Sequence, residues 1–398
     1  MEPQNNTEID STGNKPEEKF FLLRKNWRRA ENILFGVILF LVSVYFVLQS
    51  PAVQNWLVRR VIEQVSLALN TKVDLRRINI EFFDNVLLED FFIEDSRGDT
   101  LIYVRKLGVG MKSNFFTLLG KEIEIEQIEL AGARIYSRRA EGDTMNTIKT
   151  FLSRIPGKKN TGENTAIRLR IQHLNLTDVV YLSDTEVNNS RDPQIIDRER
   201  QYFHIPSGQL KIQSVDTENQ FVDIQSARFD GLYIDLESYE RPARLPVKPR
   251  SKQPVKADKP RVPMTFLVGE LSLRNGRFQF DQFFNVRMTN LPSEVMDYDH
   301  MDITDIALDG NDFEFNDEFD NNDFVLSGAI KHLAASERCG FKLKHAEAAN
   351  IQISDTLATL AGTQIQTENS SLGDTVQFRY SGYRDVRDFV DSVSMYIR

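Results

Sequence analysis

Residues 122–130 read Glu-Ile-Glu-Ile-Glu-Gln-Ile-Glu-Leu, and this stretch decides the fold class. Its apolar positions are Ile123, Ile125, Ile128 and Leu130. They alternate with glutamates, apart from one slip at Gln127. Successive side chains of a β-strand point to opposite faces, so the alternation predicts a strand with one apolar face and one wetted face. Similar alternation begins after residue 71, and the sequence therefore predicts a mainly β protein from there onward.

One local pattern recurs along this β-rich part. It joins two alternating segments through Gly, Asp or Asn, and its copies are Ile128–Tyr136, Leu174–Leu182, Leu271–Phe280 and Ile306–Phe315. Gly, Asp and Asn tolerate the positive φ of tight turns, so we interpret each copy as a β-hairpin. The copies are unevenly spaced, which argues against a solenoid of fixed period.

The charge and cysteine content exclude some classes of protein. The formal net charge is −9. A nucleic-acid surface needs clustered Lys and Arg to neutralise phosphates, so we expect no nucleic-acid partner. Cys339 is the only cysteine in the sequence. A single thiol forms neither an intramolecular disulfide nor a cysteine-based zinc site.

A membrane anchor is predicted near the N-terminus. Residues 1–31 form a polar tail with a basic end, which we expect to be disordered, and residues 32–50 follow as an uncharged, largely apolar run. At 1.5 Å per residue the apolar heart, 33–48, spans about 24 Å, and its flanks extend it toward the ~30 Å hydrocarbon core. A cleaved signal peptide fits poorly, because the apolar core is long and a small-residue cleavage site is lacking. The anchor residues are Ile33, Leu34, Phe35, Val37, Ile38, Leu39, Phe40, Leu41, Val42, Val44, Tyr45, Phe46, Val47 and Leu48.

The basic residues on the two sides of this run predict its orientation. Those before it are Arg24, Lys25, Arg28 and Arg29. Only Arg59 and Arg60 follow it closely. The positive-inside rule therefore places the N-terminus in the cytoplasm and the rest of the chain, after residue 50, on the other side of the membrane.

Residues 51–70 are predicted to form an amphipathic helix. Ser50 and Pro51 are typical of the N-cap and first helical position, and apolar residues then recur at helical spacing. The helix could cap a sheet, lie at the membrane surface with Trp56 in the interface, or simply pack on a core. The apolar stripe fits all of these uses.

Residues 241–263 are predicted to form an extended loop between two β-rich parts, 71–240 and 264–398. The segment alternates prolines with Lys and Arg, a composition that cannot pair within a sheet. Its basic charge could touch anionic lipid headgroups, although most such segments are solvated insertions.

The sequence carries no recognisable catalytic signature. It lacks a Gly-rich phosphate loop, a G-x-S-x-G motif and an H-E-x-x-H motif, and its 5 histidines share no ligand spacing. We therefore expect a protein that is not an enzyme, with no catalytic residue, no cofactor and no metal site.

Several segments together resemble one known family. The segment Pro51–Leu57, after a basic tail and an anchor, resembles the N-terminus of AsmA-like and TamB proteins of Gram-negative envelopes. Thr71–Phe83, Leu88–Asp95 and Gly98–Leu101 are similar to the segment that follows in TamB-type proteins. The likeness is good over about 50–140 and weaker to about 330. Relatives are usually much longer, so a truncated form or a shorter cousin is expected.

The resemblance implies an elongated, open antiparallel β-sheet groove of the bridge-like lipid-transfer type. It implies a single-pass inner-membrane protein whose bulk lies in the periplasm, with phospholipid as its cargo and the outer-membrane assembly machinery as a possible partner. The candidate groove residues are Ile123, Ile125, Ile128, Leu130, Leu174, Leu176, Leu271, Leu273, Phe278 and Phe280. Two alternatives stay open: these residues could form an ordinary sandwich core, and the protein could be a periplasmic scaffold or assembly factor whose sheet edges pair with client strands.

Overall fold

The computed structural model describes most of the chain from Ser50 onward. The described ranges are 50–69, 71–81, 85–95, 97–111, 122–154, 168–188, 194–216, 221–244, 264–283, 295–316, 325–381 and 393–398, with position 192 and isolated positions between 35 and 47. The chain divides into two compact units, Met1–Leu57 and Val58–Arg398. The second unit holds all of the β structure.

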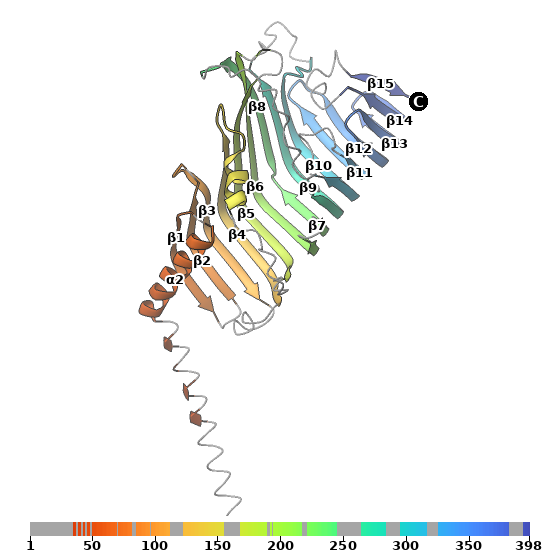
Figure 1. Cartoon of the computed structure of the whole chain (residues 1–398). Helices are drawn as coiled ribbons and strands as arrows, with labels where there is room; N and C mark the ends of the chain where they lie inside the picture. The colour runs from red at the N-terminus through yellow and green to blue at the C-terminus, as the bar shows by residue number, and fades with distance from the viewer. Residues whose placement is uncertain are drawn as a thin grey trace, which may run out of the picture. The chain divides into compact units, whose positions relative to one another are not determined.

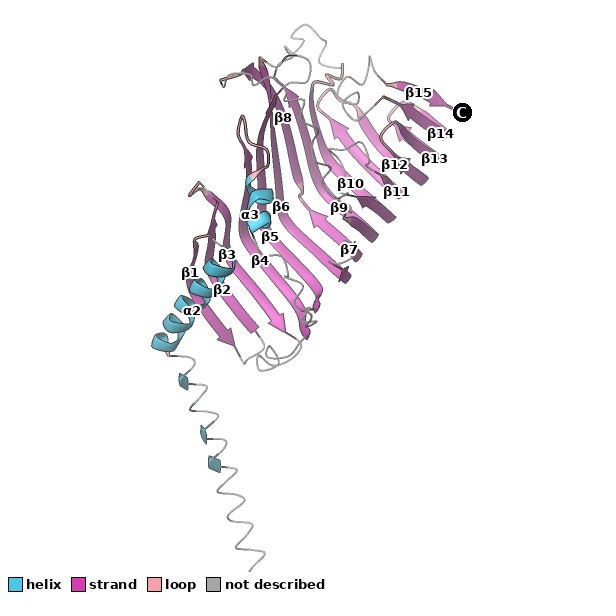
Figure 2. Ribbon diagram, in the orientation of Figure 1, coloured by secondary structure: helices cyan, strands magenta, loops and turns pink. Residues whose placement is uncertain are grey.

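The described elements are two helices and a long series of strands (Figures 1 and 2). The helices are α2 (Pro51–Leu69) and α3 (Thr147–Arg154). The strands are β1 (Val73–Glu81), β2 (Asn85–Glu94), β3 (Thr100–Met111), β4 (Glu122–Arg139), β5 (Arg168–Asn188), β6 (Ile195–Asp216), β7 (Phe221–Asp230), β8 (Tyr233–Pro242), β9 (Thr265–Gln282), β10 (His300–Asn316), β11 (Leu326–Glu337), β12 (Lys342–Ile353), β13 (Leu357–Thr367), β14 (Ser371–Arg379) and β15 (Ser394–Ile397). The expectation of a mainly β fold is confirmed.

All of these strands belong to one 15-stranded sheet. Its order follows the chain from β1 to β15, except that β7 and β8 occupy one position between β6 and β9. β7 pairs with the half of β9 that begins at Thr265, and β8 pairs with the half that ends at Gln282. Among the described residues β1 pairs only with β2 and β15 only with β14, so this sheet has two free edges.

The sheet is mixed, and the expectation of a purely antiparallel sheet is wrong. β4 pairs with β5 in parallel, and β9 runs parallel to both β7 and β8. A parallel pair needs a connection that returns from one end of the strands to the other. The connection from β4 to β5 contains α3, and the proline-rich segment after β8 connects to β9. β8 extends to Pro242, so the first two residues of the segment predicted to be a loop are part of a strand.

The recurrent pattern read as hairpins forms continuous strands instead. Gly132 (φ 66°), Asp178 (φ 53°) and Asn275 (φ 54°) adopt the positive φ that the pattern predicts, but they lie inside β4, β5 and β9. Gly132 and Asp178 lie where the strand pairing keeps its register, whereas Asn275 lies at a register shift with β10 and marks a β-bulge, an extra residue that bends the strand and increases its twist without reversing the chain. Asp305 and Asp312 do the same in β10. The physical reason is that each flanking segment pairs with other strands rather than with its own neighbour.

α2 covers most of 51–70, the segment predicted to be helical. In the second unit, Val58 is buried and the Ser66 Oγ accepts a hydrogen bond from the Val73 amide, 3.2 Å away. Most of the predicted anchor, 32–50, lies outside the described residues, and those of its side chains that are described, such as Phe35 and Phe46, are exposed. Among the described residues, no helix has the length and apolarity needed to span a membrane.

Candidate functional site

An uninterrupted row of apolar positions crosses the sheet at right angles to the strands. It takes one directly opposed residue from every strand between β1 and β14 except β8, and we call it the central row. Its members, in order, are Ile78, Leu88, Leu107, Leu130, Leu176, Gly208, Phe229, Leu273, Leu308, Leu333, Ala346, Ile365 and Leu372. Gly208 is the one position without a side chain, and there the Phe229 ring lies so close that an added Cβ would stand 3.1 Å from it.

Two flanking rows run parallel to the central row. The lower row consists of Val86, Val109, Ile128, Leu174, Leu210, Ala227, Leu271, Gly310, Ile330 and Ala348. The upper row consists of Val73, Ile93, Ile102, Ile135, Tyr181, Phe203, Ile234, Phe278 and Ile303, and ends opposite the buried Glu337. Apart from that end point, the three rows contain no charged residue.

Side-chain packing places the three rows on the same face, which we call the apolar face. In the first half of the sheet, one cluster around Val104, Ala133 and Val179 contacts both Ile102 of the upper row and Leu130 of the central row. In the second half, a cluster around Ala227, Val268 and Phe313 contacts members of the central and lower rows. The bulges shift the alternation within each strand, and the packing shows that they keep the apolar side chains together.

The predicted groove residues lie on this face wherever their side chains are described. Leu130, Leu176 and Leu273 belong to the central row, Ile128, Leu174 and Leu271 to the lower row, and Phe278 to the upper row. Phe280 follows Phe278 by two residues in β9, and Ile125 is buried in β4. Ile123 pairs with Leu169, but its side chain lies outside the described ones.

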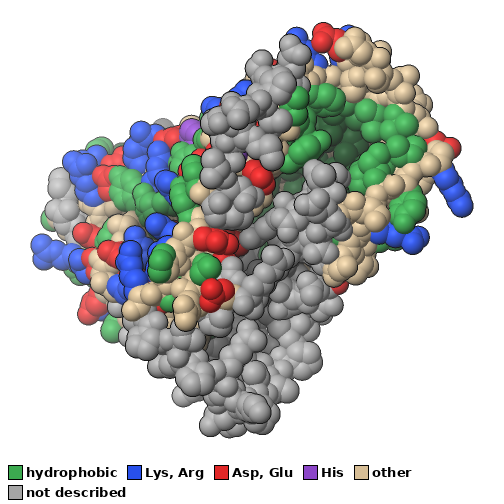
Figure 3. Space-filling model, turned by 90° about the horizontal axis from the view of Figure 1, so that it is seen from above, with side chains coloured by type: hydrophobic (Ala, Val, Ile, Leu, Met, Phe, Trp, Pro, Cys, Tyr) green, Lys and Arg blue, Asp and Glu red, His purple; other side chains and the backbone are tan. Residues whose placement is uncertain are grey.

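The apolar face is covered incompletely. Apart from Ile78 and Gly208, every member of the central row is half-buried rather than buried. Two sheets packed face to face would bury these side chains fully, and the described strands all belong to one sheet. Figure 3 shows hydrophobic side chains gathered in a hollow, on the side of the view where the C-terminal strands lie. The single sheet and the half-buried central row favour an open face over the alternative of a sandwich core.

The opposite face is charged. Arg274 and Arg277 flank apolar-face residues in β9, so they point away from that face, and they contact Asp309 at 2.8 Å and Asp302 at 2.9 Å in β10. Each arginine, through its hydrogen bonds, lowers the pKa of its aspartate. These cross-strand pairs keep the charged face hydrated, and they leave the other face to apolar side chains alone.

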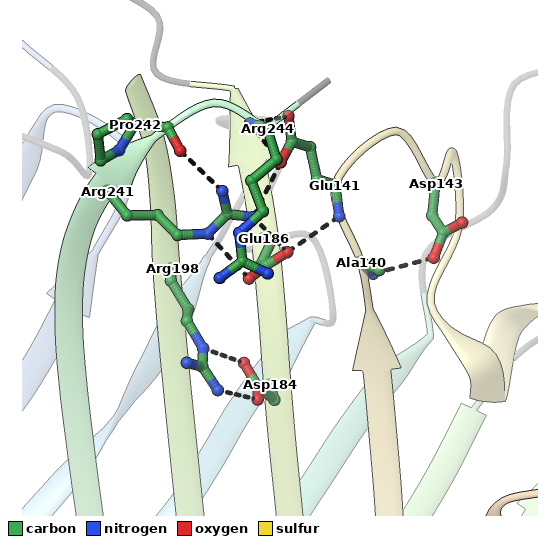
Figure 4. A network of polar contacts seen from close by, with 9 residues as sticks. All are labelled: Ala140, Glu141, Asp143, Asp184, Glu186, Arg198, Arg241, Pro242 and Arg244. Carbon is green, nitrogen blue, oxygen red and sulfur yellow. Dashed lines mark hydrogen bonds and ion pairs between the residues drawn. The ribbon is translucent and has the colours of Figure 1, made fainter. Parts of the chain in front are cut away.

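A second polar network holds the end of β4 to β5 and β8 (Figure 4). Arg241 of β8 contacts Glu186 at 2.8 Å and Glu141 at 2.9 Å, and the amide of Arg244 donates to Glu141 at 3.0 Å. The Glu141 amide in turn donates to Glu186 at 3.1 Å. The hydrogen bond from Arg241 to Glu186 is the main reason that the pKa of Glu186 is lowered. The turn after β4 is thus fixed to the sheet by charged contacts.

Several residues of the apolar face were missed at the sequence level. They include the central-row residues of the later strands, Leu308, Leu333, Ala346, Ile365 and Leu372, and the Gly208–Phe229 pair. Alternation is present around each of them, but bulges interrupt it and Ala and Gly carry little hydrophobic signal. Most of these residues would be found if the alternation of apolar residues were followed separately before and after every Gly, Asp and Asn in a strand.

The described residues offer little for other chemistry. They contain no group of three or more His, Cys, Asp or Glu side chains arranged to hold a metal ion. Burial, followed by a hydrogen bond with Glu337, raises the pKa of the Cys339 thiol, which keeps it protonated and weakly nucleophilic. The arrangement can hold apolar chains on one face and water on the other.

No family model matches the chain, and no curated protein matches it.

Proposed function

We propose that the apolar face is a groove that shields phospholipid acyl chains from water, in a protein tethered to the inner membrane by residues 32–50 and extending into the periplasm. The observation that carries this proposal is the central row, which continues across the sheet without a charged residue. Half-buried apolar residues in such number are costly unless something covers them. Acyl chains are an occupant of matching chemistry.

The energy scale supports a groove of this kind. Two 16-carbon chains lose roughly 25 kcal/mol when they leave an apolar phase, at about 0.8 kcal/mol per CH₂. Contact with an apolar surface that is open along one side removes much of this cost and leaves the headgroup in water. With strands about 4.8 Å apart, the central row extends for about 60 Å. Lipids could therefore move along it without a catalytic step, and transport between the inner and outer membranes is the function that we infer.

A binding experiment tests the proposal. The full chain, purified in detergent, should carry phospholipid that mass spectrometry identifies. Leu333→Glu places a charge in the central row and should abolish that lipid. Lys331→Glu is the matched control, since Lys331 is an exposed residue of the same strand and directly follows Ile330 of the apolar face, and it should leave the lipid unchanged. Folded wild-type protein without lipid would contradict the proposal.

A periplasmic assembly factor is the second candidate. β15 forms a free edge of the described sheet, and Met395, Tyr396 and Ile397 in it are exposed. Strand edges of this kind pair with extended segments of other proteins. This function predicts crosslinks between β15 and strands of outer-membrane proteins, together with no bound phospholipid.

A further inference from the structure

α3 lies on the apolar face, where it occupies space that the proposed groove would give to lipid. Ile148 and Phe151 of this helix pack against the buried cluster of Val73, Ile93 and Leu101. Phe91 and Ile102 contact both this cluster and the one that includes the central row. α3 therefore lies over the apolar face and not over the charged one.

Several described residues at the start of the helix make polar contacts. The Asn146 side chain caps α3 by accepting a hydrogen bond from the Lys149 amide at 2.7 Å. The Thr147 hydroxyl accepts one from the Arg138 amide at 3.0 Å, and Thr147 is buried. Glu141 lies in the charged network of Figure 4. This end of the connection is fixed by directional bonds.

The body of α3 is held differently. Ile148 and Phe151 make apolar contacts, which are not directional, and both side chains are half-buried. A helix of 8 residues is too short to be stable without tertiary packing. Anything that offers Val73, Ile93 and Leu101 an equivalent apolar contact therefore competes with the helix directly.

We propose that α3 is a built-in occupant of the apolar face, which phospholipid acyl chains displace while the turn before it stays in place as a pivot. This inference rests on the proposed function, because it assigns a regulatory element to the same groove. The helix covers the apolar surface of the first strands when lipid is absent, and its displacement opens that surface when lipid arrives. The apolar surface of the first strands is thus kept from water when no lipid is bound.

The test combines hydrogen exchange with a binding assay on the full chain, with pyrene-labelled phosphatidylethanolamine as the probe. Lipid should increase amide exchange in α3 and leave β4 unchanged. A double substitution, Ile148→Ser with Phe151→Ser, removes the apolar contact that competes with lipid. Because lipid then no longer spends binding free energy on displacing α3, the double substitution should tighten binding by up to about tenfold. Leu308→Ser, a truncation of the central row outside the cluster that α3 contacts, is the control and should weaken binding.

The possible outcomes distinguish a failure of this inference from a failure of the proposed function. Binding of the probe with unchanged or greater protection of α3, and weaker binding by the double variant, would overturn the inference: α3 would then be part of the lipid site, and the proposed function would stand. If the folded wild-type protein does not bind the probe, the proposed function and this inference both fail. Circular dichroism and thermal melting establish that each variant is folded.

Discussion

Arg134 of β4 contacts Asp178 of β5 at 2.8 Å, and Asp178 has a left-handed backbone conformation (φ 53°) inside its strand. The His204 ring of β6 contacts the same carboxylate at 3.0 Å. One side chain on the charged face therefore connects three strands at a point where the chain bends. On the other face, Val179 directly follows it and is buried with Ala133 and Val104.

This relationship predicts different effects for two substitutions of Asp178. Asp178→Asn keeps a residue that tolerates left-handed φ and removes the charge. Because both partners are partly exposed, the ion pair is worth about 0.5–1 kcal/mol, and the loss should be of that size. Asp178→Val also removes the conformational tolerance and should cost about 1–2 kcal/mol more. Urea unfolding followed by circular dichroism measures both; equal losses would mean that backbone strain at position 178 contributes nothing.

Acid should destabilise the sheet through its arginine-paired carboxylates. Hydrogen bonds with arginine lower the folded-state pKa of Asp178, Asp184, Asp302 and Asp309. A lowered pKa contributes stability that is complete above the unfolded pKa, about 4, and is lost as the pH falls through the folded value. Melting temperature should therefore be insensitive to these groups near pH 7 and fall below about pH 4. Arg277→Gln should make the decrease in melting temperature below about pH 4 smaller. If that decrease is unchanged, the partner carboxylate Asp302 does not contribute to it.

Asp235 should behave in the opposite way. Burial, with a further contribution from Glu237, raises the pKa of the Asp235 carboxyl, and its Oδ1 is buried without a hydrogen-bond partner in the described part of the chain. The charged form is penalised in the folded state, so this group costs stability above its folded pKa, and the cost disappears as the pH falls through it. Asp235→Asn should raise the melting temperature at pH 7 and have little effect at pH 3. A lower melting temperature at pH 7 would mean that the charge has a partner.

The Phe313 ring lies close to two glycines, Gly310 and Gly328. A Cβ at Gly310 would stand 2.6 Å from this ring and 2.6 Å from the carbonyl oxygen of Ala329, and one at Gly328 would stand 2.5 Å from the ring. Gly310→Ala should therefore cost about 1–3 kcal/mol, the usual cost of overpacking. Gly373→Ala is the control, because the nearest atom to its added Cβ is 3.7 Å away. Adding Phe313→Leu to Gly310→Ala should recover part of the loss; a neutral Gly310→Ala would show that the ring moves aside freely.

The sequence predicted the strands better than their connections, and the reason is physical. The alternation around Ile128 and Leu130 is a local property of one strand, and it placed these residues correctly on one face. Gly132 and Asp178 were correctly assigned positive φ but wrongly assigned to turns. A turn and a bend inside a strand can use the same φ, and the choice between them depends on which distant segments pair.

The candidate site was predictable only in its earlier part for a related reason. Leu174 and Leu176 stand beside Asp178, a residue type that signals positive φ, so their alternation is easy to read. Ala346 belongs to the central row because it pairs with Leu333 and Ile365. No local pattern in β12 encodes this pairing. The parallel pairing of β4 with β5 was likewise invisible, because it depends on which distant segments pair and not on a local pattern.

Photocrosslinking with phosphatidylethanolamine that carries a diazirine on one acyl chain tests the central claim most directly. Chains bound along the apolar face should label peptides containing Leu273, Leu308 and Leu333. Label on the charged face, at Arg274 or Lys331, or an absence of label on folded protein, would contradict the account.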